Sequence, residues 1–128
     1  MAGDLARLGR NLLAQSRPAE AEAPLREALG TFEKSPPDGW QRFDAMSLLG
    51  GSLQGQGRYA EAEPLVISGY QGMKERESRI VALDQFRMRE AGPRVIRLYE
   101  MWGKPEKVTE WRARLKSLDL PAKDSARH

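Results

Sequence analysis

The chain has 128 residues, of which 40% are apolar and 30% are charged, as expected for one globular domain with a continuous core. It contains no cysteine, which excludes disulfides and thiolate chemistry, and its short apolar runs exclude a membrane-spanning helix. Its net charge of +3 is unevenly divided, at −2 for residues 1–71 and +5 for residues 72–128. A basic half can attract an acidic partner, although it is more often a solvated helical face.

The N-terminal segment does not resemble a secretory signal. Asp4 interrupts residues 1–13, and no continuous apolar stretch with a cleavage site follows. The sequence therefore predicts a cytoplasmic protein without a membrane attachment.

Residues 4–33 predict a first pair of helices. The earlier helix, over residues 4–15, carries four leucines on one face: Leu5, Leu8, Leu12 and Leu13. Pro18 suits the first turn of the later helix, where its missing N–H costs little, and this helix extends to about Glu33. Its expected buried stripe consists of Ala21, Leu25, Ala28 and Leu29.

A second pair of helices is predicted over residues 39–55 and 59–75. Pro36-Pro37 ends the preceding helix, and Asp38 is the expected N-cap, with Gln41 three residues later at capping-box spacing. The inward side chains of the helix that follows are Trp40, Phe43, Met46, Leu49 and Leu53.

Two adjacent glycines lie inside the helix over residues 39–55. Glycine costs about 1 kcal/mol relative to alanine in a helix interior. Because Gly50 and Gly51 are kept there, the sequence predicts a close crossing with a neighbouring helix.

The third pair is less regular. Residues 80–102 form either one long helix or two, because Gly92-Pro93 must kink or break a helix. The expected apolar face consists of Val95, Ile96, Leu98, Tyr99 and Trp102. After a turn at residues 103–105, a last helix is predicted over residues 106–115, and residues 119–128 are expected to be a disordered tail. The inward residues of the last helix are Val108, Trp111 and Leu115.

Residues 17–26 are echoed by residues 58–67, 41 positions later. The identical pairs are Arg17 and Arg58, Ala19 and Ala60, Glu20 and Glu61, Ala21 and Ala62, and Glu22 and Glu63. Such a period is typical of stacked helical hairpins, each of which buries its apolar face against the next. The sequence therefore predicts an all-α fold, and a protein that binds rather than catalyses.

The repeated positions resemble the tetratricopeptide pattern, in the extended variety found in kinesin light chains. One repeat reads Gly9, Leu12, Ser16, Pro18, Ala21, Leu25 and Ala28, and the next reads Gly50, Leu53, Gly57, Tyr59, Ala62, Val66 and Gly69. A degenerate third places Tyr99, Gly103, Pro105 and Val108 at the corresponding positions, with Ile96 in place of the glycine. The resemblance implies a right-handed α-α superhelix of about three stacked hairpins in one domain, residues 1–118. The repeats would cover about residues 2–35, 39–78 and 80–116.

The segments PPDGWQRFDAMSLLGGSLQGQGRYAEAEPL, GYQGMKERE and RLYEMWGKPEKVTEWRARL are similar to the helical region that follows the kinase domain in some bacterial serine/threonine protein kinases. No glycine-rich phosphate loop and no HRD or DFG motif is present. The similarity implies a non-catalytic interaction or scaffolding module, an accessory segment of a kinase signalling protein or a stand-alone relative of one.

The tetratricopeptide resemblance also implies a binding groove lined by the first helix of each hairpin. The corresponding positions are Arg7, Arg10, Leu13, Ala14, Asp44, Ser47, Gly51, Gln54, Arg94, Arg97, Glu100 and Met101. Of these, the residues expected to contact a peptide are Arg7, Arg10, Asp44, Gln54, Arg94, Arg97 and Glu100. The arginines can hold a carboxylate or an acidic peptide through charge-assisted hydrogen bonds, or they are simply a solvated surface.

A second predicted contact surface is the first helix itself. No capping element precedes it in the sequence, and an uncapped repeat exposes apolar surface. Leu5, Leu8 and Leu12 are therefore expected to be partly covered, either by a second copy in a homodimer or by an upstream segment.

Catalytic, metal and cofactor sites are not predicted. The only histidine is His128, and cysteine is absent, which leaves no soft-metal ligands. Glu20 and Glu22, like Glu61 and Glu63, are two apart on a helix and do not face each other. Their position at helix starts, where carboxylates complement the helix dipole, explains them.

The alternative function is binding of nucleic acid or another polyanion by the basic C-terminal half. Its arginines are Arg76, Arg79, Arg87, Arg89, Arg94 and Arg97. The acidic residues interleaved with them are Glu75, Glu77, Asp84, Glu90 and Glu100. Since these acids weaken the attraction for phosphate, nucleic-acid binding is not favoured.

The large apolar side chains divide into core and surface candidates. Trp102 and Trp111 fall on inward stripes and are expected in the core. Trp40 either packs on the loop before its helix or is an exposed anchor for a partner. The methionines at Met73, Met88 and Met101 are expected to fill gaps in the packing.

Overall fold

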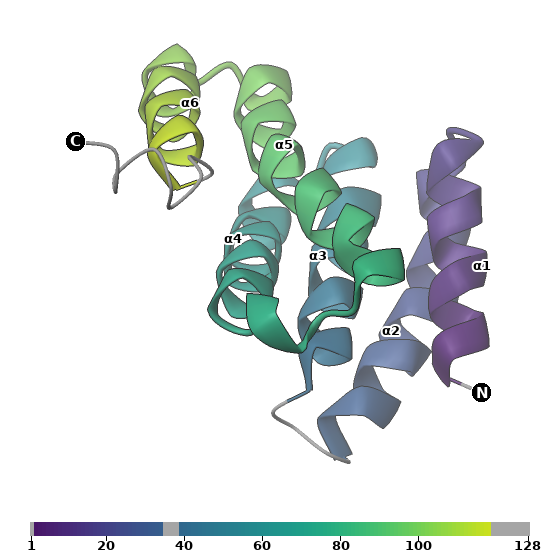
Figure 1. Ribbon diagram of the computed structural model, residues 1–128. Coiled ribbons are helices and arrows are strands. Elements are labelled where there is room, and N and C mark those ends of the chain that lie inside the picture. The colour runs from purple at the N-terminus through teal and green to yellow at the C-terminus, as the bar shows by residue number, and fades with distance from the viewer. Residues whose placement is uncertain (1, 35–38, 119–128) are drawn as a thin grey trace.

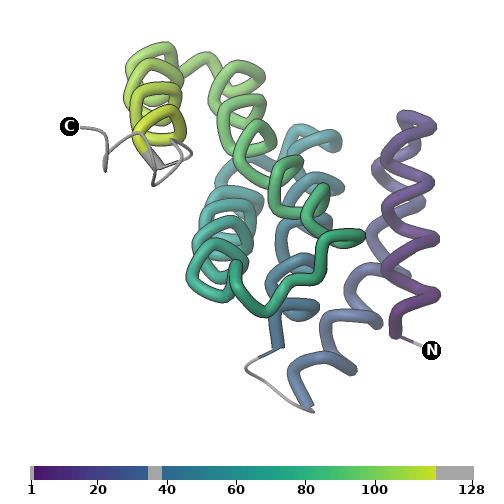
Figure 2. Tube along the Cα trace, viewed as in Figure 1, coloured from purple at the N-terminus to yellow at the C-terminus, as the bar shows by residue number. Residues whose placement is uncertain are grey.

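The computed structural model describes residues 2–34 and 39–118. In this part of the chain all regular structure is helical (Figures 1 and 2). The six α-helices are α1 (Ala2–Ala14), α2 (Pro18–Lys34), α3 (Trp40–Gly55), α4 (Tyr59–Glu75), α5 (Gln85–Trp102) and α6 (Pro105–Leu118). No described helix is both long and apolar enough to cross a membrane.

The helices pack in sequence order as three antiparallel pairs. Figure 1 shows α1 and α2 at one end of the molecule, α3 and α4 in the middle, and α6 at the other end. Helix α3 packs against α1, α2, α4 and α5, so it lies at the centre of the fold. Most of its residues are buried, and its buried polar residues are Asp44, Ser47, Ser52 and Gln54.

Each pair is joined by the same kind of turn. One residue of the turn has left-handed backbone geometry: Ser16 (φ 59°), Gly57 (φ 78°) and Gly103 (φ 75°). The next N–H then donates to the carbonyl five residues earlier, at 2.8 Å for Arg17, 2.9 Å for Arg58 and 2.9 Å for Lys104. This is the hydrogen bond of a Schellman C-cap, which ends one helix and directs the chain back along it.

The predicted close crossing in the second pair is confirmed. A Cβ atom on Gly50 would lie 2.4 Å from Val66 Cγ1, and one on Gly69 would lie 2.7 Å from the backbone nitrogen of Ser47. Real Cβ atoms do not approach other atoms so closely. Glycine at these two positions therefore lets the backbones of α3 and α4 touch.

The repeated glutamates join successive pairs. Glu22 in α2 accepts hydrogen bonds from Gln56 and Arg58 at the turn of the next pair, each at 3.0 Å. Glu63 in α4 accepts one from the buried Tyr99 hydroxyl in α5 at 2.6 Å. The helix dipole is therefore only part of the explanation for these acids.

Several sequence predictions about helix ends are wrong. The third pair does not begin with a helix at residue 80, because residues 77–79 and 82–84 form single 3₁₀ turns before α5 begins at Gln85. Helix α5 then continues through Gly92-Pro93, which excludes a break there. Gly39, not Asp38, holds the N-cap position of α3. Asp38, like the predicted tail at residues 119–128, lies outside the described residues.

Most of the predicted core residues are buried, whereas Leu29, Met46 and Ile96 are only partly buried against the core. Trp111 is buried, but Trp102 is half-buried, with its ring stacked on Tyr99 at 6.3 Å between centroids. Met101 is exposed, whereas Met73 and Met88 are buried as predicted. Leu12 belongs to the core rather than to an exposed edge. Trp40 is half-buried and packs against the core, within 5.9 Å of the Arg87 guanidinium.

Candidate functional site

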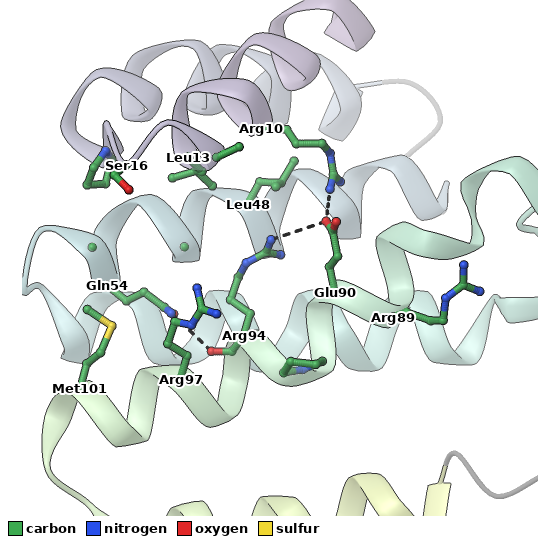
Figure 3. Close-up of a pocket in the computed structure, with 15 residues that line it drawn as sticks. Arg10, Leu13, Ser16, Leu48, Gln54, Arg89, Glu90, Arg94, Arg97 and Met101 are labelled. Atoms are coloured by element: carbon green, nitrogen blue, oxygen red, sulfur yellow. Dashed lines mark hydrogen bonds and ion pairs between the residues drawn. The ribbon is translucent and has the colours of Figure 1, made fainter.

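The candidate site is an open cleft of about 730 Å³ between α1 and α5, with α3 as its floor (Figure 3). Its charged lining residues are Arg10, Arg89, Glu90, Arg94 and Arg97, and its apolar ones include Leu13, Leu48, Pro93 and Met101. Clefts of 300–1,000 Å³ with mostly apolar walls and a few polar groups are typical ligand sites. Four arginines oppose one glutamate, so the cleft is positively charged.

The floor of the cleft is shaped by Gly51. A Cβ atom at this position would lie 3.1 Å from Arg94 Nε and 3.3 Å from Leu13 Cδ1. Glycine thus allows both Arg94 of α5 and Leu13 of α1 to pack closely on α3.

A buried carboxylate on α3 is hydrogen-bonded to arginines of both α1 and α5. Asp44 of α3 is only 4% exposed and accepts hydrogen bonds from Arg10 at 2.9 Å and from Arg87 at 3.1 Å. Arg87 also donates to Asp84 at 3.0 Å. A carboxylate buried to this degree must be paired, and here two helices supply its partners. Asp44 therefore orients Arg10 rather than meeting a ligand.

Arg94, like Arg10, is largely buried, with 16% of its side chain exposed. Its Nη1 donates to the hydroxyl of Ser47 at 2.7 Å, and its Nη2 lies 4.0 Å from the carboxylate of Glu90. Burial, and after it the nearby charge of Arg10, lowers its pKa to about 10, while Asp44 and Glu90 act in the opposite direction. The guanidinium is still charged at neutral pH, but its charge is incompletely compensated.

Glu90 joins the two walls. Its carboxylate accepts a hydrogen bond from Arg10 of α1 and lies beside Arg94, as Figure 3 shows. Arg97 and Arg89 have no ion pair within the described residues, and both are exposed. In Figure 3 the Arg97 side chain extends toward the floor of the cleft, whereas Arg89 lies at the opposite end.

Two buried polar atoms of the site have no hydrogen-bond partner among the described residues. They are Nε of Arg10, a donor, and Oε1 of Gln54, an acceptor. Gln54 is only 3% exposed, and its amide nitrogen donates to the Arg94 carbonyl at 3.4 Å. Unpaired buried polar groups cost free energy and are rare, so they often mark where another group belongs.

The structure brings together four of the seven residues that the sequence assigned to the groove. Arg10, Gln54, Arg94 and Arg97 line the cleft. The other three do not: Asp44 is buried beneath Arg10, Arg7 pairs with Asp4 at 3.7 Å, and Glu100 pairs with Arg112 of α6 at 2.8 Å.

The predicted self-association surface is only partly present. Leu8 is exposed and Leu5 is half-buried, but Leu12 packs in the core. Of the three leucines that the sequence assigned to this surface, only Leu5 and Leu8 therefore remain accessible on α1.

The sequence does not predict the role of Glu90, which it presents only as an acid interleaved with basic residues. Its spacing of four from Arg94 is a signal of an ion pair on one helix face. The contact with Arg10, 80 positions away, has no local sequence signal.

The described residues contain no group of three or more histidines, cysteines, aspartates or glutamates placed to hold a metal ion. Glu20 pairs with Arg17 and Glu61 with Arg58, each across one helical turn. The hydrogen bond from Arg17 lowers the pKa of Glu20, and that from Arg58 lowers the pKa of Glu61. These acids are thus held ionised by arginines of the repeat itself.

Comparison of the chain with known protein families, with curated proteins and with solved structures finds no match. What the cleft can do follows from its own residues. It presents guanidinium donors above a mostly apolar floor, and none of the described residues that line it is a histidine, cysteine or lysine. This arrangement suits the binding of a ligand that carries hydrogen-bond acceptors and negative charge.

Proposed function

We propose that this chain is a non-catalytic protein-interaction module that holds a segment of a partner protein in the cleft between α1 and α5. The observation that supports this function best is the cleft itself, where four arginines and one glutamate surround an apolar floor. Arginine and apolar side chains are enriched where proteins bind each other. The volume of about 730 Å³ is large enough for a few side chains of a peptide segment and too small for a folded domain.

The same proposal includes a tetratricopeptide-like array with a right-handed superhelical arrangement of its three pairs. Its support is the sequence echo at 41 residues together with the shared left-handed turns at Ser16, Gly57 and Gly103. Small residues at the closest helix contacts, such as Gly50 and Gly69, agree with it. The similarity to helical regions of bacterial serine/threonine kinases favours a role as an accessory or scaffolding segment in signalling.

Polyanion binding by the basic half is the weaker candidate. Arg87 is directed at Asp44 and Asp84, and Arg94 at Ser47 and Glu90. Arg87, which is held by two carboxylates, is therefore not available to extend a phosphate-binding stripe.

Cross-linking and quantitative mass spectrometry can test the interaction function. The variant carries Arg97→Glu and Met101→Glu, two exposed changes in the cleft. The control carries Ala113→Glu and Lys116→Glu, two exposed changes on α6. We expect partners cross-linked to the wild-type chain to be lost with the cleft variant and kept with the α6 variant. Equal recovery with both variants would overturn the assignment of the cleft as the binding surface.

A further inference from the structure

Glu90 is more exposed to water than the two arginines that it pairs with. Its side chain is 47% exposed, whereas those of its partners Arg10 and Arg94 are each 16% exposed. In Figure 3 its carboxylate lies between the two guanidinium groups, at the level where α1 and α5 face each other. A water-accessible carboxylate is thus held by two largely buried cations.

From this geometry we propose that Glu90 is an internal substitute for the ligand, which is an acidic peptide segment. A glutamate or aspartate of the ligand replaces Glu90 beside Arg10 and Arg94. This inference rests on the proposed function and adds to it the class of the ligand and a contact that competes with it.

The exchange is physically reasonable because losing an ion partner costs more free energy for a largely buried arginine than for the half-exposed Glu90. When Glu90 leaves, its exposed carboxylate is solvated by water at little cost. Arg10 still has Asp44, whereas Arg94 keeps a direct hydrogen bond only to the neutral hydroxyl of Ser47. A buried cation without a directly paired anion is destabilised, so the space beside Arg94 favours another anion.

The cleft favours a peptide carboxylate over a phosphate chain. The group that already fits between the arginines is a carboxylate, which accepts charge-assisted hydrogen bonds from guanidinium. The unpaired acceptor Oε1 of Gln54 requires an N–H, which a peptide backbone supplies and a phosphodiester backbone does not. The half-buried Leu13 and the exposed Met101 offer apolar contact in the same cleft as the exposed cation Arg97. The ligand is therefore a segment that carries two acidic residues and an apolar one.

The Arg10–Glu90 pair also links α1 to α5 across the cleft. A ligand that displaces Glu90 breaks this link, so the wild-type chain binds more weakly than a chain without the internal carboxylate. If the paired state is populated at about 90%, its removal raises the apparent affinity about tenfold.

Fluorescence anisotropy with a labelled hexapeptide tests this inference. The probe contains two glutamates separated by one leucine, has both ends blocked, and is compared with the same peptide carrying two glutamines. The variant is Glu90→Gln. Its matched control is Glu100→Gln, which removes the same charge from the same helix. The Glu100 side chain is 48% exposed and pairs with Arg112 outside the cleft.

We expect the glutamate peptide to bind Glu90→Gln about tenfold more tightly than wild type, and Glu100→Gln within twofold of wild type. Peptide binding that is equal in the two variants overturns the role of Glu90, while the interaction function remains. Failure of all three chains to bind the glutamate peptide, or tighter binding of the glutamine peptide or a DNA oligonucleotide, overturns the ligand class.

Circular dichroism first checks that both variants fold. If Glu90→Gln does not fold, the wild-type chain provides the measurement through the ¹³C signal of the Glu90 carboxyl group. We expect this signal to move on saturation with the glutamate peptide, because its contacts with Arg10 and Arg94 are replaced. An unchanged signal at saturation overturns the displacement.

Discussion

Replacing Gly69 by alanine tests directly whether the backbones of α3 and α4 touch. The added Cβ would lie 2.7 Å from the backbone nitrogen of Ser47 and 2.8 Å from the carbonyl oxygen of Phe43. Ordinary contacts begin at 3.4 Å. Because both obstacles are backbone atoms, no side-chain rotation can relieve the clash, and the two helices must separate.

The expected loss of stability follows from two opposing effects. Overpacking of a tight interior costs about 1–3 kcal/mol, and a backbone clash belongs near the upper value. Alanine recovers about 1 kcal/mol because it is the better helix former. The net loss for Gly69→Ala is therefore about 2 kcal/mol, which corresponds to a decrease in Tm of about 8 °C for a chain of this size.

Gly30→Ala is the matched control for this experiment. Gly30 also lies inside a helix, but a Cβ added there meets no atom within 4 Å. We expect this variant to gain up to about 1 kcal/mol, with Tm about 4 °C above wild type. Thermal unfolding followed by circular dichroism measures both. A Gly69→Ala chain that melts at or above the wild-type Tm would refute the close crossing.

Three further substitutions test the polar contacts. Asp44→Ala should lower the free energy of unfolding in urea by about 3 kcal/mol, since it leaves two arginines without their buried carboxylate. Glu22→Gln should weaken the acid sensitivity of stability. Hydrogen bonds from Gln56 and then from Arg26 lower the pKa of Glu22 from its usual 4.5. The stability that this carboxylate contributes is hence present above about pH 4.5 and is lost as the pH falls through the lowered pKa. Tyr99→Phe should cost about 2 kcal/mol in thermal unfolding, because it removes the hydroxyl that donates to a carboxylate at 2.6 Å.

Each of these three predictions has an outcome that would contradict it, and the first two also have a control variant. Asp4→Ala removes a highly exposed aspartate and should change stability little, so an equally small effect at Asp44 would exclude a buried network. Glu27→Gln serves as the exposed control for the pH series, and identical acid profiles for this variant and Glu22→Gln would contradict the assignment. For Tyr99→Phe, a loss below about 0.5 kcal/mol would show that the hydroxyl contributes nothing net.

The helical pairs could be predicted because their signals are local. Apolar spacing, Pro18 at a helix start and glycine at the turns act within one or two helical turns of chain, and α4 agrees with its predicted range, residues 59–75. The start of α5 could not be predicted in the same way, although its end at Trp102 agrees with the predicted range. The Gln85 side chain donates to the carbonyls of Glu77 and Ile80, and these contacts fix 3₁₀ turns that have no strong sequence pattern.

The site was predicted in composition but not in geometry. The tetratricopeptide resemblance selected Arg10 and Arg94 as groove residues, and both line the cleft. It also selected Asp44 as an exposed contact, and this is wrong because α1 and α5 close over α3. Whether a polar position on a central helix meets solvent depends on its neighbours, and sequence periodicity describes only the helix itself.

By itself the sequence determined that this chain is helical, that its helices come in pairs and that the second pair crosses closely at glycine. These properties depend on backbone preferences and on apolar spacing within each segment. Only the tertiary structure decided which charges meet. Arg10, Asp44 and Glu90 lie on three different helices, and their contacts depend on how the pairs stack. The free energy of a buried or half-buried charge is set by its partners in space, and those partners are far apart along the chain.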